Sequence, residues 1–351
     1  MTTISLSTEL TKKIKLINIG NGSRTASGYL YSRNICEIDN KHISEFDAYN
    51  NFKGMKGVTR KFQQEVDSYL NGMFLKNQLK GIEFDILHYT QSSIPRINTT
   101  ATEVVTVHDN PNTILQSDFI YGTSVGDIIR KKYWKRLFDK YKYIENVLTN
   151  SNYVRTSLLE YGFTGNVETI YHPVGPYFKR LTDKNKIRVE LGLPIDKILL
   201  LSVSTYGKRK NLTLIEKAMK NLSDKFILVR VGTQLGSSIT FHNVSNEQIN
   251  MIYNACDLLL IPSLEEGLGA PLIEGLASGL PVVASNIEVF HETGGDAIEY
   301  INPLEVQSLV NGIYNAIEYG DEMIKKGEKI ATKFSFDTFR KKMLKYYTHL
   351  P

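Results

Sequence analysis

Short apolar runs rich in β-branched residues alternate with helical patterns along the whole chain. Most of the runs are continuously apolar rather than alternating, which is typical of parallel strands covered on both faces. The expected strands are 14–19, 86–89, 104–107, 146–149, 167–171, 198–203, 226–231, 258–261, 281–285 and 297–300. The expected helices between them include 58–76, 153–161, 212–222, 246–256 and 303–319.

This strand–helix–strand order predicts α/β architecture with doubly wound parallel sheets. One sheet holding all of these strands would be unusually large, so two Rossmann-like domains are expected instead. The natural joint is the stretch His172-Pro173-Val174-Gly175-Pro176. We expect an N-terminal domain over 1–175, a C-terminal domain over 176–335, and a last helix within 336–351 that packs back on the first domain.

Composition limits the class of protein. The 351 residues are 42% hydrophobic and 23% charged, which are globular values. The sequence has no apolar stretch long enough to span a membrane and no signal-peptide pattern, so a cytoplasmic protein is expected. Cys36 and Cys256 are too few for a disulfide framework or a structural zinc site, and we expect two reduced thiols.

The charge balance is 42 basic minus 37 acidic residues, or +5, which is no signature of a nucleic-acid-binding protein. Much of the excess lies in 130–142 (RKKYWKRLFDKYK), with seven basic residues against one acidic residue. Ile129, Tyr133, Leu137, Tyr141 and Ile144 recur at helical spacing and predict an amphipathic helix. That helix either contacts an anionic membrane surface or is an ordinary surface helix whose aromatic residues face its own core.

Two familiar phosphate-binding motifs are missing. The turn after the first expected strand runs from Gly20 through Gly22 to Gly28, but Thr25 stands where a dinucleotide fingerprint needs glycine. No GxxxxGK[ST] motif occurs either. The turn nevertheless leaves backbone N–H groups at a helix start, where a ligand could approach.

The most informative segment is 258–285, LLLIPSLEEGLGAPLIEGLASGLPVVAS. A buried strand is followed by a glycine-rich loop and by a helix for which Pro271 is a suitable first residue and Gly279 a suitable stop. Gly267 and Gly269 expose amides at the positive end of that helix, which favours anion binding. Two carboxylates, those of Glu266 and Glu274, lie in these apolar surroundings; a helix-dipole contact and a solvated helix face are the respective structural alternatives.

This segment resembles the signature of the family 4 glycosyltransferases, which have the GT-B fold. The family shows E-G-F-G-L-P-x-x-E followed by A-x-G-x-P-V-V-A, and the chain shows EGLGAPLIE followed by ASGLPVVA. The chain departs from the pattern at Leu268 and Ala270, both of which are apolar replacements.

Other stretches follow in the family's order. The run 104–109 (VVTVHD) is similar to the strand that delivers a histidine, here His108, to the donor sugar. Arg209-Lys210-Asn211 resembles the motif whose lysine grips the donor diphosphate. Many relatives carry an arginine five or six residues earlier, where this chain has Ser204 and Thr205, so a second cation must come from Lys208, Arg209 or elsewhere. The run 241–253 looks like the segment whose backbone meets the base.

The resemblance implies retaining transfer of a hexose from a nucleoside-diphosphate sugar to a hydroxyl group. The first domain would bind a glycan or lipid-linked acceptor, and the second would bind a UDP-, GDP- or ADP-linked donor. The implied catalytic residues are His108, Lys210 and Glu266, the last of which would also orient the donor sugar. The implied donor-binding residues are Gly20, Gly22, Arg24, Arg209, Lys210, Glu266, Gly267, Leu268, Gly269, Ala270 and Glu274. No metal or other cofactor is expected, because no DxD pair is apparent.

Two other classes share the fold. A GT-B epimerase would use a nucleotide sugar without an acceptor, and product analysis separates it from a transferase. A non-catalytic nucleotide-sugar or glycan-binding protein would tolerate loss of several of the motif residues. Glu266, Glu274, Lys210 and His108 are all present, whereas the missing phosphate arginine keeps this second alternative open.

Overall fold

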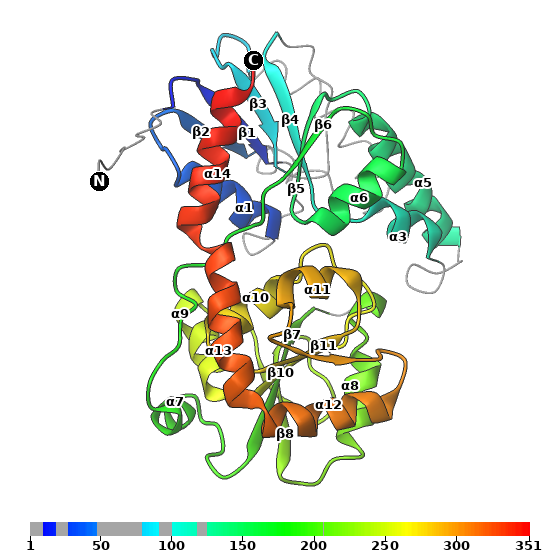
Figure 1. The fold of residues 1–351 in the computed structure, drawn as a ribbon, viewed down its shortest axis with the longest axis vertical. Helices are drawn as coiled ribbons and strands as arrows, with labels where there is room; N and C mark the ends of the chain where they lie inside the picture. The colour runs from blue at the N-terminus through cyan, green and yellow to red at the C-terminus, as the bar shows by residue number, and fades with distance from the viewer. Residues whose placement is uncertain (1–9, 19–26, 48–78, 91–99, 118–124, 206) are drawn as a thin grey trace, which may run out of the picture. The chain divides into compact units, whose positions relative to one another are not determined.

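The computed structural model describes residues 10–18, 27–47, 79–90, 100–117, 125–205 and 207–351. The chain forms two compact units (Figure 1). The first unit comprises Met1–Gln116, Thr123–His172 and Asp337–Pro351, and the second comprises Ser117–Gly122 and Pro173–Phe336. The predicted helix 58–76 and the predicted ligand residues Gly20, Gly22 and Arg24 lie outside the described residues.

The first unit contains a six-stranded parallel sheet with strand order β2-β1-β3-β4-β5-β6. Its strands are β1 (Ile14–Asn18), β2 (Ile43–Asp47), β3 (Ile86–Tyr89), β4 (Thr102–Val107), β5 (Asn146–Thr149) and β6 (Asn166–Thr169). Its helices are α1 (Ser27–Cys36), α3 (Pro111–Gln116), α5 (Val125–Tyr141), α6 (Asn152–Glu160) and α14 (Phe336–His349).

The last helix, α14, is held to the first unit by buried polar contacts. Tyr347 Oη lies 2.6 Å from Nδ1 of His88, and Nε2 of His88 lies 2.7 Å from Oγ1 of Thr106. Arg340 Nε donates to the carbonyl of Ile38 at 3.3 Å. His88 is fully buried, and burial lowers its pKa to about 3, so it is a neutral structural histidine.

The second unit contains another six-stranded parallel sheet, with order β12-β11-β10-β7-β8-β9. Its strands are β7 (Ile198–Ser204), β8 (Phe226–Gly232), β9 (Ile239–Phe241), β10 (Leu258–Ile261), β11 (Val282–Ser285) and β12 (Glu299–Ile301). Its helices are α7 (Lys184–Glu190), α8 (Leu212–Met219), α9 (Asn246–Ala255), α10 (Ala270–Ala277), α11 (Glu288–Gly294), α12 (Val306–Glu318) and α13 (Gly320–Ala331), with 3-10 turns at Lys208–Lys210 and Thr332–Phe334.

The sheet of the second unit is covered on both faces, which explains its continuously apolar strands. Leu258 and Leu260 of β10 belong to the core cluster that includes Ile215 of α8 and Ile313 of α12. A Cβ on Gly275 of α10 would meet the side chain of Leu259 at 2.7 Å, so α10 packs closely on the other face. Successive side chains of a strand point to opposite faces, so every position of β10 is buried.

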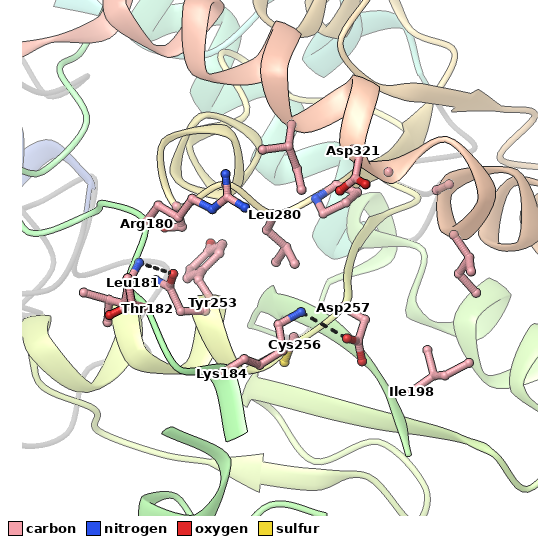
Figure 2. Close-up of a pocket in the computed structure, with 18 of the residues that line it drawn as sticks. Arg180, Leu181, Thr182, Lys184, Ile198, Tyr253, Cys256, Asp257, Leu280 and Asp321 are labelled. Carbon is pink, nitrogen blue, oxygen red and sulfur yellow. Dashed lines mark hydrogen bonds and ion pairs between the residues drawn. The ribbon is translucent and has the colours of Figure 1, made fainter. Parts of the chain in front are cut away.

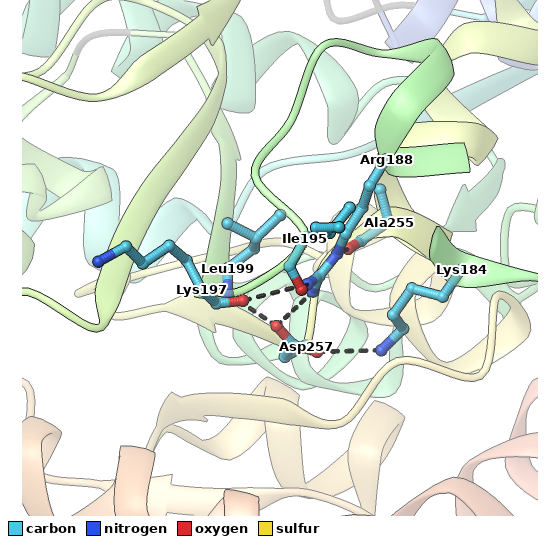
Figure 3. A network of polar contacts seen from close by, with 7 residues as sticks. All are labelled: Lys184, Arg188, Ile195, Lys197, Leu199, Ala255 and Asp257. Carbon is cyan, nitrogen blue, oxygen red and sulfur yellow. Dashed lines mark hydrogen bonds and ion pairs between the residues drawn. The ribbon is translucent and has the colours of Figure 1, made fainter. Parts of the chain in front are cut away.

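The amino edge of this sheet is fixed by an ion pair between a buried arginine and a partly exposed aspartate (Figure 3). Nη2 of Arg188 in α7 donates to Oδ2 of Asp257 at 2.6 Å, and its Nε donates to the carbonyl of Ala255 at 2.8 Å. The same carboxylate oxygen accepts from the backbone N–H of Leu199 at 2.7 Å. Because Asp257 precedes β10 and Leu199 lies in β7, this pair sets how the two central strands begin.

The chain order of the strands reverses beside β7, with β8 on one side and β10 on the other. In open α/β sheets, ligands bind outside the carboxyl ends of the strands at such a switch point. The loops that follow β7 and β10 are therefore the expected place for a site in this unit.

The α/β prediction with two parallel sheets is confirmed, with two omissions. The edge strands β2 and β9 were not predicted. The sequence of β2, ISEFD, has polar residues on both faces of the strand, and β9, with the sequence ITF, is only three residues long. Strand ends also shift by one or two residues: Pro281 precedes β11 rather than beginning it. Domain limits at 175 and 335 stay a prediction; the chain passes from the first compact unit to the second after His172 and returns to the first at Asp337.

Candidate functional site

The loop that follows β7 presents two adjacent cations. After Ser204, the chain forms a 3-10 turn over Lys208–Lys210 and then enters α8. Asn211 makes the connection in the left-handed conformation, with φ of 51°, and its side-chain amide donates to the carbonyl of Pro303 at 2.7 Å. This short, tied turn directs Arg209 and Lys210 toward the neighbouring loop.

The loop that follows β10 supplies the carboxylate. Ser263 Oγ donates to Oε1 of Glu266 at 2.9 Å. The backbone N–H of Leu264 donates to the carbonyl of Arg209 at 2.7 Å, which ties this loop to the one after β7. The loop ends at Gly269, whose φ of 82° favours glycine, and where a Cβ would lie 2.6 Å from Cε1 of Phe290. Glycine is therefore required here by both the backbone conformation and the available space.

The two loops meet through Glu266. Its Oε2 accepts from Nη1 of Arg209 at 2.9 Å, and its Oε1 pairs with Nζ of Lys210. The Glu266 side chain is 8% exposed, whereas those of Lys210 and Arg209 are 16% and 37% exposed. The structure thus brings together three of the predicted residues, with the carboxylate buried and the cations nearer to solvent.

Electrostatics keep Glu266 ionised. Burial alone would raise the pKa of its carboxyl group, but the charges of Lys210 and Arg209 and the hydrogen bonds from Lys210 and Ser263 hold that pKa below its usual value. The arrangement can present positive charge to an anion while the carboxylate accepts hydrogen bonds from hydroxyl groups.

The remaining loop residues differ in exposure. Leu268 is 5% exposed and Gly269 is buried, while Gly267 is partly exposed and Ala270 is exposed. Helix α10 begins at Ala270, so Pro271 is its second residue rather than its first as predicted, a difference within the usual uncertainty of helix ends. Gly279, with φ of 67°, follows the end of this helix as predicted.

Glu274, in α10, accepts a hydrogen bond from a side chain whose role the sequence pattern did not predict. Tyr253 Oη in α9 donates to its Oε2 at 2.6 Å. Burial raises the pKa of Glu274 to about 7, although the Tyr253 hydrogen bond acts in the opposite direction. Glu274 is partly exposed, so its carboxylate is held by Tyr253 while part of the residue remains accessible to solvent.

His108 lies in the first unit, directly after β4. Its Nε2 lies 2.8 Å from the carbonyl of Thr90, and because a carbonyl only accepts, Nε2 carries the proton and Nδ1 offers a lone pair. No partner for Nδ1 is found among the described residues. Burial lowers the pKa of His108 despite the opposing effects of Thr90 and Asp109, so the ring is neutral near pH 7.

An aromatic cluster surrounds this histidine. His172 stacks on Tyr31 with ring centroids 4.1 Å apart, and it meets His108 edge-on at 4.8 Å. Tyr31 also contacts His108 at 5.5 Å. In the sequence, His172 stands only in the expected joint between domains, and nothing in its local pattern indicates a place beside His108.

The basic helix has a mixed environment. In α5, Leu137 and Tyr141 of the predicted apolar stripe are buried, as is Phe138 beside it, so part of the stripe faces the core. Ile128 and Ile129 are 48% and 50% exposed near the start of the helix. Both alternatives for this helix therefore stay open.

Metal-ligand clusters and membrane-spanning helices are both absent from the described ranges. In residues 10–351 apart from the gaps given above, no group of three or more His, Cys, Asp or Glu side chains is placed to hold a metal ion. No helix of the described chain is long and apolar enough to cross a membrane. Among the described residues, Cys36 and Cys256 are not joined by a disulfide bond.

A pocket of about 760 Å³ lies at the amino edge of the second sheet (Figure 2). Ile198 at the start of β7 and Asp257 before β10 line it, together with Arg180, Lys184 and Asp321. Its lining carries charges of both signs and includes none of the predicted site residues. The candidate site occupies the opposite, carboxyl edge of the same sheet.

Comparisons with known proteins agree with this geometry. Residues 183–333 match the family model "Glycosyl transferases group 1". The O-antigen chain mannosyltransferase RfbU of Salmonella typhimurium is 27% identical over 275 residues, which cover 72% of this chain and 70% of RfbU.

Two solved structures share the fold over nearly the whole chain. Sucrose-phosphate synthase of Thermosynechococcus elongatus aligns with a TM-score of 0.79 at 16% identity, covering 96% of this chain and 98% of that one. Anabaena HepE, solved with UDP-glucose, aligns with a TM-score of 0.75 at 16% identity, covering 97% and 100% of the two chains.

The two parallel sheets form the GT-B fold, and the family match together with the similarity to RfbU identifies the chain as a glycosyltransferase. Residues 183–333, most of the second unit, match the group 1 glycosyltransferases, also called family 4.

Proposed function

We propose that this enzyme transfers a hexose from a nucleoside-diphosphate sugar to a hydroxyl group of a glycan or lipid-linked acceptor, with retention of anomeric configuration and without a metal ion. The observation that carries the proposal is the pairing of Arg209 and Lys210 with buried Glu266 at the switch point of the second sheet. The second unit would bind the donor, and the first would bind the acceptor.

The chemistry follows from the charges at this site. The bond between the anomeric carbon and the phosphate oxygen breaks, the acceptor oxygen forms the new bond, and the acceptor proton passes to the departing diphosphate. Negative charge grows on the diphosphate as it leaves, and preorganised cations stabilise such charge strongly. Lys210 and Arg209 supply that stabilisation, assisted by the amides of Gly267 and Gly269 at the amino end of α10.

The two carboxylates have separate roles in this proposal. Glu266 accepts hydrogen bonds from hydroxyl groups of the transferred sugar and fixes its orientation, while phosphate oxygens compete with it for Lys210 and Arg209. Glu274 accepts hydrogen bonds from the ribose hydroxyls. Leu268 and Ala270 complete the loop that covers the diphosphate.

His108 would act from the first unit as a neutral ring beside the transferred sugar. Its unprotonated Nδ1 is suited to accept a hydrogen bond from a hydroxyl group. Gly20, Gly22 and Arg24 stay predictions from the sequence for closure over the diphosphate.

The proposed reaction needs a nucleoside-diphosphate hexose as the donor, and we expect it to be a UDP-, GDP- or ADP-sugar. The printed names of the relatives support this range, since RfbU is a mannosyltransferase and HepE was solved with UDP-glucose. The association of RfbU with the O-antigen chain supports a growing glycan as the acceptor.

The test is thermal stabilisation of the full chain by a panel of nucleoside diphosphates and their hexose derivatives. A ligand at about 100 times its dissociation constant adds roughly 2.7 kcal/mol to stability. We expect one base to stabilise the protein clearly, and the Lys210→Ala and Glu266→Ala variants to respond less. A panel without any stabilising nucleotide would contradict the proposed donor site.

Product analysis with the stabilising donor then separates transfer from epimerisation. A transferase leaves the donor sugar on a hydroxyl acceptor with retained configuration, whereas an epimerase returns a changed nucleotide sugar without an acceptor. The same assay with a chelator tests the absence of a metal requirement: we expect unchanged turnover, and loss of activity restored by a divalent cation would contradict it.

A further inference from the structure

Arg230 is a fully buried arginine whose contacts with the described residues include no carboxylate. It lies in β8, within the apolar run FILVRVG, and its side chain is 0% exposed. Its Nη1 donates to Oγ of Ser202 at 2.6 Å and to the Ser202 carbonyl at 3.1 Å. Its Nη2 donates to the carbonyl of Ser204 at 2.8 Å, and its Nε donates to the carbonyl of Thr233 at 3.2 Å. Every one of these acceptors is neutral.

The same unit shows how this chain neutralises another buried arginine. Arg188 is 4% exposed and pairs with the carboxylate of Asp257 at 2.6 Å (Figure 3). A buried charge that lacks a counter-ion is costly even when its donors are satisfied. Burial lowers the pKa of Arg230 to about 10, which still leaves the guanidinium charged at neutral pH. The presence of a charged arginine in the apolar strand β8 therefore needs an explanation other than packing.

The position of Arg230 links it to the candidate site. Its hydrogen bonds tie Ser204, the last residue of β7, to Thr233, which follows β8. A Cβ on Gly232 would lie 2.3 Å from the carbonyl oxygen of Ser204, so the two strand ends approach very closely. The turn that carries Arg209 and Lys210 starts only a few residues beyond Ser204.

We propose that Arg230 is a positioning residue of the donor site, which fixes the carboxyl ends of β7 and β8 and supplies buried positive charge that a bound diphosphate neutralises. The guanidinium does not touch the ligand, because it is enclosed by its own hydrogen bonds. Arg230 acts in two ways. Its hydrogen bonds fix the backbone of β7, which places Lys210, and its positive charge is screened only weakly in the low-dielectric interior. This inference rests on the proposed function of the site.

The experiment measures two dissociation constants for each variant by calorimetry. One is for the nucleoside diphosphate that the thermal-stabilisation panel selects, and the other is for the corresponding nucleoside. Arg230→Met removes the charge and keeps an unbranched apolar side chain. We expect it to weaken diphosphate binding by about tenfold or more, the equivalent of at least about 1.4 kcal/mol. Nucleoside binding should change by less than about threefold, because a nucleoside carries no phosphate charge.

Arg188→Lys is the matched control, because it alters a buried arginine at the other edge of the same sheet. It should lower the melting temperature and leave the ratio of the two affinities unchanged. Arg230→Lys keeps the charge and should retain most of the diphosphate preference. If Arg230→Met does not fold, Arg230→Gln replaces it as the neutral variant and carries the same prediction.

An equal loss of affinity for nucleoside and diphosphate would overturn the inference and make Arg230 purely structural. An unchanged ratio in both neutral variants would also overturn it, while leaving the proposed function intact. Failure of the wild-type protein to bind any nucleoside diphosphate would instead contradict the proposed function, and this inference with it.

Discussion

Lys210 and Glu266 are 56 positions apart in the sequence, yet their side chains form an ion pair at the carboxyl edge of the second sheet. Arg209 engages the other oxygen of the same carboxylate. The pairing joins the loop after β7 to the loop after β10, the two loops that flank the switch point. It therefore places a buried carboxylate and two cations where α/β sheets bind their ligands.

The ion pair should be energetically coupled. Lys210→Met and Glu266→Gln should each destabilise the protein, and the double variant should lose less than the sum of the two, with a coupling of about 0.5–3 kcal/mol. Denaturant unfolding of the four proteins measures this coupling. The exposed pair Lys326–Glu322 serves as control, since exposed pairs couple weakly. Additive losses at Lys210 and Glu266 would show that the contact has no energetic role.

Glu266 should make stability depend on pH in the acid range. Its pKa is depressed below the ordinary value of 4.5, so its contribution is fully present above that pH and is lost as the pH falls through the lower folded value. The difference in unfolding free energy between wild type and Glu266→Gln should therefore shrink as the pH falls below about 4.5. A difference that stays constant from pH 7 to pH 3 would contradict the depressed pKa.

Glu274 should make the protein less stable as the pH rises, whereas Glu266 should make it less stable as the pH falls. Its folded pKa of about 7 lies above the ordinary 4.5, so the native state holds a proton that the unfolded state has lost. Stability should fall as the pH rises from about 4.5 to 7, and Glu274→Gln should reduce that fall. Unfolding curves of both proteins across this range test the sign, and identical pH profiles would rule it out.

The same proton should influence nucleotide binding. A carboxylate accepts ribose hydroxyls better than a carboxylic acid, so nucleoside affinity should increase between pH 6 and pH 8 in the wild-type protein. Glu274→Gln should bind weakly and without this pH dependence. Tyr253→Phe removes the hydrogen bond that lowers the pKa of Glu274, so it should shift the increase to higher pH. Calorimetric titrations at several pH values would detect either behaviour.

The basic helix α5 gives a separate prediction about membranes. If its charged face contacts anionic lipid, changing Lys131, Lys132, Lys135 and Arg136 to Glu should reduce co-sedimentation with vesicles that contain anionic phospholipid. A control with four lysines of the second unit changed to Glu (Lys217, Lys220, Lys225 and Lys329) should bind as the wild type does. Equal binding of both variants and the wild type would favour the alternative of an ordinary surface helix.

Sequence periodicity predicted most of this fold because buried parallel strands are continuously apolar. The run 258–261 is an example, since both of its faces are covered by helices. Edge strands such as β9 lack that cover, and their sequences carry no comparable pattern. Short strands of mixed polarity are defined by the neighbour with which they pair rather than by their own residues.

The candidate site, like the fold, was predicted from the sequence only in part. The motif residues Glu266 and Lys210 were found from the sequence, but their direct pairing depends on two distant loops meeting in the folded chain. Tyr253, the partner of Glu274, ends the run 241–253, which the sequence singled out for its backbone and not for this hydroxyl group. Arg230 could have been singled out from the sequence, because a charged residue within an otherwise apolar strand indicates a role that packing does not explain.

The most direct test of the donor site is the dissociation constant of the selected nucleoside diphosphate for wild type, Lys210→Ala and Lys208→Ala, measured by calorimetry at constant salt. Lys208 lies in the same 3-10 turn but is exposed, so it controls for loss of surface charge. We expect Lys210→Ala to bind at least about tenfold more weakly, the equivalent of roughly 1.4 kcal/mol, and Lys208→Ala to bind almost as well as the wild type. Equal affinities for all three proteins would contradict the account of this site.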